Sequence, residues 1–374
     1  MSPLLGLLVN PVAGMGGRVG LHGTDGPTRI AEARRLGAAS VTAPRAARAI
    51  SRLATRNIDL LTAPGAMGAD VLSDSELQFS RIALDIGHET TRKDTEHAAR
   101  MLADSGVELL LFAGGDGTAN DVVRGAGTSL PILGIPSGVK MRSGVFARTP
   151  EAAGDLAADF LGRSNRPVTS AELLDLADEG TREALLGIAT VPRLGGNRLV
   201  GSKNSSVMSS AAAVEATCRE VARELLPHTL YLFGPGSTTG KILEELGIES
   251  TPLGVDAVLE RKLVGADLNE DQILRLMPSA PRTKLVLGVI GGQGFVLGRG
   301  NQQIGPRVLD RLNPDDLIIV ATAEKLLDLY PSELNVDIGD DRPYSWITGY
   351  HRVRIGPQRY MMMHVASPTE SSSQ

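Results

Sequence analysis

The stretch Phe112-Ala113-Gly114-Gly115-Asp116-Gly117-Thr118-Ala119-Asn120-Asp121 directly follows the apolar run from Val107 to Leu111. The apolar run predicts a strand that is buried on both faces, as in a parallel sheet covered by helices. Three glycines after a strand predict a loop whose backbone comes close to a ligand, because glycine has no side chain. A helix expected over about 119–126 adds unpaired N–H groups and a positive dipole end. The segment therefore predicts a loop that binds an anion such as a phosphate.

Asp116 is the unusual residue of this loop. A carboxylate beside a polyphosphate is unfavourable unless it binds a metal ion or takes a proton from an attacking group. The residues of the loop alone leave two interpretations of Asp116 open, a catalytic carboxylate or a turn-forming residue. Thr118 and Asp121 stand three residues apart at the expected helix start, which is the spacing of a capping box. We expect that structural role for this pair.

Two further loops have a similar character. The expected strand from Leu4 to Val9 runs into Asn10-Pro11-Val12-Ala13-Gly14-Met15-Gly16-Gly17. Ligands of open parallel sheets bind at the carboxyl ends of the strands, so two such loops can face one crevice. A third polar loop, from Gly234 to Gly240, follows the expected strand from Thr229 to Phe233. Its hydroxyl groups can contact a phosphate or a sugar, or they can cap a helix expected over 238–246.

Strands and helices alternate in the first half of the chain, which predicts an α/β domain with a parallel, Rossmann-like sheet. The strands expected there cover 4–9, 59–63, 107–113 and 132–135, and a helix is expected over 95–105. A helix over 150–161 leads into a second region with more strands, which predicts a β-rich α+β domain. The strands expected there are 171–177, 184–191, 228–233, 253–259, 283–290, 317–321 and 353–365, and the helices are 207–226, 238–246, 269–277, 303–312 and 323–329.

The predicted domains are 1–147, an α/β domain with the phosphate loop, and 148–366, a β-rich substrate domain, followed by a disordered polar tail at 367–374.

The composition limits the classes of partner that the chain can bind. A formal net charge of −5 and only 3% aromatic residues argue against a nucleic-acid partner. No stretch approaches the roughly 20 apolar residues that span a bilayer, and no secretory signal is recognised. A single cysteine, Cys218, predicts a cytoplasmic protein and is expected to be structural rather than catalytic.

Several familiar templates do not fit. Gly236 to Lys241 has the wrong spacing for a phosphate-binding P-loop, and Ile242 follows the lysine. No strict G-x-G-x-x-G occurs, which disfavours a dinucleotide-binding dehydrogenase, and no G-x-S-x-G occurs, which weakens a hydrolase interpretation. The six histidines show no metal-ligand spacing. We therefore assign no residue as a direct metal ligand.

Taken together, the loops resemble those of the NAD kinase and diacylglycerol/sphingosine kinase superfamily, and the similarity is greatest to the ATP-NAD/AcoX kinase branch. The loops that carry the resemblance are Asn10-Pro11 with Gly14 and Gly17, Gly114-Gly115-Asp116-Gly117-Thr118, and Gly236-Ser237-Thr238-Thr239-Gly240. Three more stretches support the branch: Gly134 to Met141, Gln293 to Ile304, and Ala321 to Leu326. The GGDGT motif alone marks only the superfamily. The run Gly117-Thr118-Ala119-Asn120-Asp121 is also similar to the lipid-kinase form of the motif.

The resemblance implies a two-domain kinase that uses ATP (or polyphosphate) with Mg²⁺ (or Mn²⁺). It implies that Asp116 is the catalytic carboxylate and that the acceptor is the 2′-hydroxyl of the adenosine ribose of NAD, which gives NADP. The residues expected to bind phosphate or nucleotide are Asn10, Gly14, Gly16, Gly17, Gly114, Gly115, Gly117, Thr118 and Lys140. The residues expected to bind substrate are Asn120, Asp121, Gly236, Ser237, Thr238 and Thr239.

Positive side chains must offset the charge of the donor, because phosphoryl transfer depends on positioning and charge neutralisation. Lys140 is the first choice, since it follows a glycine loop at a strand end; Arg142, Lys203 and Arg18 are further candidates.

Two alternative functions stay open: a kinase of the same fold that acts on another small-molecule hydroxyl, and a nucleotide-binding regulator without turnover. The expected partners are small nucleotide substrates and a second copy of the chain in a homodimer, with no nucleic acid and no membrane.

Overall fold

The computed structural model describes residues 2–17, 19–21, 27–75, 77–87, 90–138, 141–177, 182–193, 211–251, 253–290, 293–329, 332–338 and 344–366. The chain forms two compact units. The first consists of Met1–Met15, Gly23–Arg34 and Ala39–Ser202, and the second of Gly16–His22, Arg35–Ala38 and Lys203–Gln374. The predicted tail 367–374 lies outside the described residues. Among the described helices, none combines the length and the apolar character needed to cross a bilayer.

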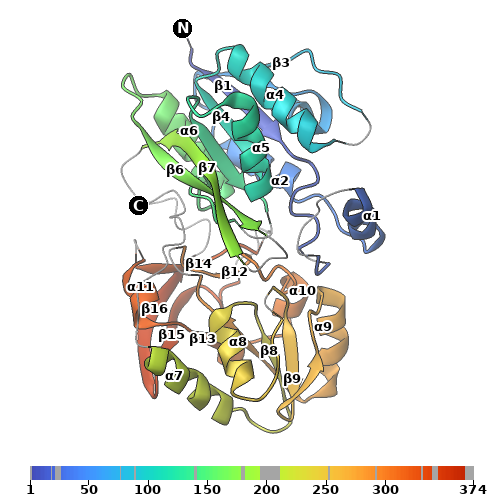
Figure 1. The fold of residues 1–374 in the computed structure, drawn as a ribbon, viewed down its shortest axis with the longest axis vertical. Coiled ribbons are helices and arrows are strands. Elements are labelled where there is room, and N and C mark those ends of the chain that lie inside the picture. The colour runs from blue at the N-terminus through green and yellow to red at the C-terminus, as the bar shows by residue number, and fades with distance from the viewer. Residues whose placement is uncertain are drawn as a thin grey trace. The chain divides into compact units, whose positions relative to one another are not determined.

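A five-stranded parallel sheet forms the centre of the first unit (Figure 1), with the strand order β3-β2-β1-β4-β5. Its strands are β1 (Leu4–Val9), β2 (Asp59–Thr62), β3 (Phe79–Arg81), β4 (Leu109–Gly114) and β5 (Ile132–Pro136). Every pairing between them is parallel. All six residues of β4 are buried. The predicted α/β fold with a Rossmann-like sheet is thus confirmed.

Helices cover both faces of this sheet. Because consecutive side chains of a strand point to opposite faces, each strand packs against helices on both sides. Leu7 packs in the same core as α2 and α6, whereas the next residue, Leu8, packs in the core of α4 and α5. This explains why β1 and β4 are apolar throughout. The helices of the first unit are α1 (Pro27–Arg35, of which Arg35 is counted in the second unit), α2 (Thr42–Ser51), η1 (Gly65–Met67), α3 (Ala69–Ser73), α4 (Arg92–Asp104), α5 (Asp116–Ala126) and α6 (Pro150–Leu161).

The antiparallel hairpin of β6 (Val168–Ala177) and β7 (Arg182–Pro192) also belongs to the first unit. Leu173 and Val191 pack in the same core as α4 and α5. The compact first unit therefore extends to Ser202 and includes α6, beyond the domain boundary expected at residue 147. Compactness does not define function, and the functional division into 1–147 and 148–366 stays a proposal.

The second unit contains a nine-stranded mixed sheet with the order β10-β9-β8-β11-β13-β15-β16-β14-β12. In that order the strands are β10 (Lys262–Gly265), β9 (Asp256–Leu259), β8 (Thr229–Phe233), β11 (Arg282–Gly288), β13 (Leu317–Val320), β15 (Gly349–Gly356), β16 (Arg359–Ala366), β14 (Glu333–Val336) and β12 (Phe295–Leu297). The middle strands β8, β11, β13 and β15 run parallel to one another. The expected β-rich second region is confirmed.

Both faces of this second sheet are also covered. Phe233 packs in one core with α7 and α8, and its neighbour Leu232 packs in the other with α9, α10 and α11. The helices of this unit are α7 (Ala211–Arg223), α8 (Ser237–Glu244), α9 (Glu270–Leu276), η2 (Met277–Ser279), α10 (Pro306–Leu309), η3 (Pro314–Asp316) and α11 (Ala323–Leu327). Because β8, β11 and β13 are parallel, their carboxyl ends lie at the same edge of the sheet.

Candidate active site

The strand order of the first sheet marks where a ligand is expected. From β1 the chain continues to β2 on one side, and from β4 it continues to β5 on the other side. The order therefore reverses between β1 and β4, and open α/β sheets bind ligands at such a switch point, beyond the carboxyl ends of the strands. Asn10 follows β1 directly, and Gly115 follows β4 directly. The two glycine loops predicted from the sequence flank this point.

Asp116 is the first residue of α5 and only 8% of its surface is exposed. Its Oδ2 accepts the backbone N–H of Arg142 at 2.8 Å, and its Oδ1 accepts the backbone N–H of Ser143 at 3.0 Å. Both donors lie in the segment after β5, so two neighbouring strand ends cooperate to orient one carboxylate. Each carboxylate oxygen has two lone pairs and can therefore accept a second hydrogen bond from a substrate.

The expected capping box of Thr118 and Asp121 is wrong. Helix α5 begins at Asp116, with Gly115 as its N-cap and no side-chain cap hydrogen bond. Thr118 lies inside the first turn, where its Oγ1 accepts a hydrogen bond from Nδ2 of Asn10 at 3.0 Å. Asp121 forms an ion pair with Arg92, at 3.1 Å between Oδ1 and Nε. The helix starts earlier than expected because Gly115, in an extended conformation, leads directly into it.

Asn10 joins the two loops. Its backbone N–H donates to the carbonyl of Ala113 at 2.9 Å, and its Oδ1 accepts the N–H of Val12 at 3.2 Å. With the bond to Thr118, it fixes the end of β1 against the start of α5. Asn120 is buried and donates to the carbonyl of Asp116 at 3.0 Å. Direct substrate contacts of these residues stay predictions.

Two close approaches of the backbone bring the loops together. Gly14 has a φ of +73°, and a Cβ atom there would lie 1.9 Å from the carbonyl oxygen of Ser137. A Cβ at Gly115 would lie 3.1 Å from the Cα of Gly138. The loops after β1, β4 and β5 therefore pack on one another through glycines. These glycines are needed for packing, whether or not a phosphate binds.

Gly114 and Gly117 differ in the space around the position that a Cβ atom would take. A Cβ at Gly114 would lie 2.4 Å from the Cβ of Thr118, whereas a Cβ at Gly117 meets no atom within 4 Å. Gly117 also lies in the first turn of α5, whose N–H groups have no partners within the helix. Of these two glycines, only Gly117 borders open space beside such donors.

Gly117→Ala should therefore separate binding from stability. Alanine favours the helix over glycine by up to about 1 kcal/mol, so thermal unfolding should occur at an equal or higher temperature. If phosphates bind against this turn, the added methyl group should raise the ATP dissociation constant on the order of tenfold. Calorimetric titration measures this change. Unchanged ATP affinity would show that the phosphates bind elsewhere.

The remaining predicted residues of the first loop are Gly16 and Gly17, whose carbonyls accept the N–H groups of Leu21 and Gly20 at 2.9 and 3.3 Å. They form a turn of their own, and their contact with phosphate stays a prediction. Lys140 lies outside the described residues, as do Arg18 and Lys203. Arg142 is described; it is half-buried, and its backbone already holds Asp116.

In the second unit, the loop predicted to hold the nucleotide follows β8. Gly236 is the N-cap of α8, which starts without a side-chain cap hydrogen bond. The capping role that the sequence left open for these hydroxyls is therefore not observed. Thr239 instead donates from Oγ1 to the carbonyl of Gly236 at 2.9 Å. Ser237 is exposed and Thr238 is buried. Nucleotide binding by these residues stays a prediction.

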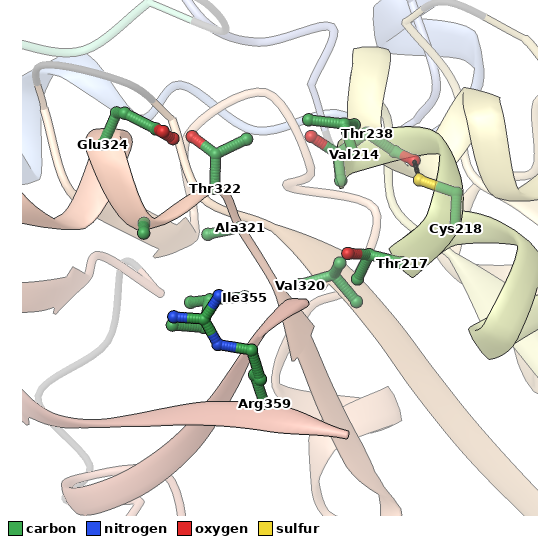
Figure 2. A pocket seen from close by; sticks show the side chains of 11 residues that line it. Val214, Thr217, Cys218, Thr238, Val320, Ala321, Thr322, Glu324, Ile355 and Arg359 are labelled. Carbon is green, nitrogen blue, oxygen red and sulfur yellow. Dashed lines mark hydrogen bonds between the residues drawn. The ribbon is translucent and has the colours of Figure 1, made fainter. Parts of the chain in front are cut away.

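Figure 2 shows a pocket of about 200 Å³ beside this loop. It lies near the carboxyl end of β13, and three hydroxyl groups line it, from Thr217, Thr238 and Thr322. Cys218 also borders it and donates from Sγ to the carbonyl of Thr238 at 3.5 Å. Residues Ala321 to Glu324, the first part of the Ala321 to Leu326 stretch noted in the sequence, line this pocket.

Cys218 is fully buried, and this burial raises the pKa of its thiol to about 11. At pH 8 roughly one thiol in a thousand is then ionised, so the structural interpretation is favoured. Iodoacetamide should modify Cys218 about 100-fold more slowly in the folded chain than in the denatured chain, as followed by mass spectrometry. Cys218→Ala should retain turnover. A loss of turnover in a variant that is still folded would show that the thiol has a functional role.

Two family models match the chain: the ATP-NAD kinase N-terminal domain over residues 5–164 and the ATP-NAD kinase C-terminal domain over residues 227–365. Together these matches cover most of the chain and both sheets. The chain belongs to the ATP-NAD kinase family, as its motifs predicted. It is thus a phosphotransferase of the kinase type. A search of curated proteins finds no match to the sequence.

Proposed function

We propose that the chain transfers the terminal phosphoryl group of ATP (or of polyphosphate) to the 2′-hydroxyl of the adenosine ribose of NAD and so forms NADP. The observation that carries this proposal is the carboxylate of Asp116, held by the N–H groups of Arg142 and Ser143 at the switch point of the sheet. Membership of the ATP-NAD kinase family supports the same reaction.

In the proposed reaction, Asp116 accepts the proton of the ribose hydroxyl while the hydroxyl oxygen forms its bond to the terminal phosphorus. The bond between that phosphorus and its bridging oxygen breaks, and ADP leaves. The two backbone donors keep the carboxylate in one orientation, so little reorganisation is needed when the proton moves. General bases placed in this way typically accelerate a reaction by roughly 100- to 10,000-fold.

The donor phosphates are proposed to lie against the first turn of α5. Its N–H groups and positive dipole end favour an anion, and the open side of Gly117 lets the phosphates approach. The chain carries a formal net charge of −5, so the attraction must be local. Arg142 is one candidate for this charge, together with Lys140, Lys203 and Arg18 from outside the described residues.

The residues present fit a divalent cation that arrives with the nucleotide. In the described part of the chain, no group of three His, Cys, Asp or Glu side chains is arranged to hold a metal ion. Magnesium is commonly bound through substrate phosphates and water with only one or two carboxylates, so it needs no such group of side chains. A Mg²⁺ (or Mn²⁺) held by the donor phosphates would neutralise their charge, and Asp116 is left to accept the proton.

The residues of the first unit proposed to contact the acceptor are Asn120 and Asp121 of α5. For the second unit, taken by itself, substrate contacts are proposed for Gly236, Ser237, Thr238 and Thr239. A screen with γ-labelled ATP and magnesium tests the acceptor directly, with NAD, NADH, a polyol and diacylglycerol as separate samples. Label in NADP is the expected result. Label only in another acceptor would retain the kinase and replace its substrate. No labelled product, with ATP binding intact, would favour a regulator without turnover.

A further inference from the structure

A second pocket, of about 310 Å³, lies in the second unit. It is on the face of the nine-stranded sheet that carries α7, where Val221 and Tyr231 belong to one core. The pocket extends past the end of α7, because Glu224, Leu225 and Leu226 form one of its walls. β13 also lines the pocket, through Leu317, Ile318 and Ile319. The side chain that packs on the α7 face is that of Ile318, which supplies apolar surface there. Its volume is at the small end of the range for small-molecule sites.

Three cationic side chains and one carboxylate line this pocket: Lys284, Arg352, Arg354 and Glu224. Arg354 has a side chain that is only 5% exposed, and it pairs with both Glu220 and Glu224. Its charge is therefore offset within the protein. Among the described residues, neither Lys284 nor Arg352 forms an ion pair with a carboxylate. The side chains that line the pocket consequently carry more positive than negative charge.

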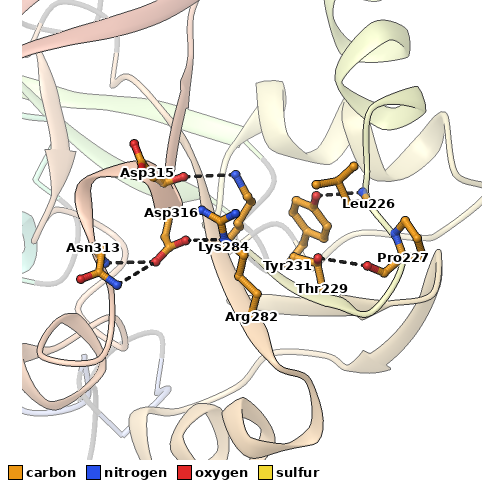
Figure 3. Close-up of polar contacts among 9 residues, drawn as sticks. All are labelled: Leu226, Pro227, Thr229, Tyr231, Arg282, Lys284, Asn313, Asp315 and Asp316. Carbon is orange, nitrogen blue, oxygen red and sulfur yellow. Dashed lines mark hydrogen bonds and ion pairs between the residues drawn. The ribbon is translucent and has the colours of Figure 1, made fainter.

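Lys284 is a half-buried cation whose charge is not paired directly with a carboxylate in the described part of the chain. Its Nζ donates to the carbonyl of Asp315 at 3.1 Å (Figure 3), which is a neutral partner. Burial lowers the pKa of Lys284, and the nearby charge of Arg282 lowers it further. The carboxylates of Asp316 and Asp315 act in the opposite direction and raise this pKa, and Asp316 is itself bound to Arg282 at 2.9 Å. An added anion would favour the charged form of the lysine.

Aromatic side chains stand beside both cations. Tyr231 is the partner of Lys284 on the neighbouring parallel strand, and Figure 3 shows the two side by side. Its hydroxyl accepts the N–H of Leu226 at 2.9 Å and retains its own proton for donation. The guanidinium of Arg352 lies 4.0 Å from the centre of the Tyr360 ring. The pocket therefore combines hydrogen-bond donors, positive charge and apolar surface.

We propose that this pocket binds a small organic anion, a carboxylate or phosphate attached to an apolar or aromatic body. The anionic group contacts Lys284 and Arg352 and accepts a hydrogen bond from the Tyr231 hydroxyl. The body lies against Leu226 and Ile318. The pocket uses the early residues of β11 and β13, whereas ligands of parallel strands bind at their carboxyl ends. It is a site separate from the loop of Gly236 to Thr239.

Calorimetric titration of the full chain with phenyl phosphate, and in parallel with benzoate, tests this site without any need for turnover. One of the two should bind saturably with one site per chain, and the better binder identifies the anionic group. Benzyl alcohol should not bind, because it lacks the charge, and inorganic phosphate should bind more weakly, because it lacks the body. Saturating ATP should leave the affinity unchanged.

Lys284→Gln should weaken binding of the better probe about tenfold or more, since it removes a charge-assisted hydrogen bond. Lys262→Gln is the matched control, because Lys262 is exposed on the edge strand β10 of the same unit. Arg352→Gln provides a second variant if the first does not fold. Absence of saturable binding by the wild type would overturn the proposal. Equal affinity in the Lys284 and Lys262 variants, or competition by ATP, would do the same.

Discussion

Replacing Asp116 with asparagine should reduce turnover by roughly 100- to 10,000-fold, the range for removal of a general base. The structure adds a second expectation. The backbone N–H groups of Arg142 and Ser143 each donate to one carboxylate oxygen, and an amide offers only one oxygen. One buried N–H then faces an NH₂ group, which costs about 1–3 kcal/mol. Steady-state kinetics and thermal unfolding measure the two effects separately.

Asp256→Asn is the matched control for this change. Asp256 is also buried and accepts the backbone N–H groups of Thr251 and Asp267, at 2.6 and 3.1 Å. It should show a similar loss of stability while turnover stays within a few-fold of the wild type. A catalytic role for Asp116 is contradicted if both variants lose stability and neither loses turnover.

Gly14→Ala should destabilise the first unit strongly. Gly14 has a left-handed backbone conformation, which is about 1–2 kcal/mol less favourable for a residue that has a side chain. The new methyl group would also lie 1.9 Å from the carbonyl oxygen of Ser137, a backbone atom that cannot rotate away. The overlap adds to the backbone cost, so the unfolding temperature should fall by several degrees or more. Thermal denaturation followed by circular dichroism measures the change.

Gly106→Ala separates the two contributions. Gly106 has a similar φ of +80°, but a Cβ atom there meets nothing within 4 Å. This control should therefore show only the backbone cost. If both variants lose the same stability, the contact between the loop after β1 and Ser137 is not tight, and the described packing of the glycine loops is wrong.

The sequence predicted the central strands well because their apolar runs are continuous. Strand β1 was predicted with its observed bounds, and α6 as well. The start of α5 was placed three residues late, because Asp116 and Gly117 have low helix propensity and the apolar pattern begins only at Ala119. Helix α2 was missed: it contains Pro44 and lacks a side-chain cap hydrogen bond.

The second sheet was harder to predict. Strands β10, β12 and β14 have only three or four residues, too few for a periodic pattern to be recognised. The expected strand over 353–365 is in fact the hairpin of β15 and β16, which reverses between Gly356 and Arg359. The hairpin of β6 and β7 was assigned to the second domain, although it packs in the first unit.

Asp116 could be predicted as a site residue because an acid among glycines is chemically unusual. Its partners could not be predicted, since the N–H groups of Arg142 and Ser143 are backbone donors 26 and 27 residues away. Any residue except proline supplies such a donor, so the sequence carries no signal for it. The contacts of Gly14 with Ser137 and of Gly115 with Gly138 are similarly invisible before the fold is known.

The formation of NADP by the wild-type chain tests the central proposal most directly. The purified protein is incubated with ATP, magnesium and NAD, and NADP is measured by an enzymatic cycling assay. We predict NADP that accumulates in proportion to time and enzyme, and that depends on ATP. No NADP from a folded chain that binds both nucleotides would contradict NAD as the acceptor.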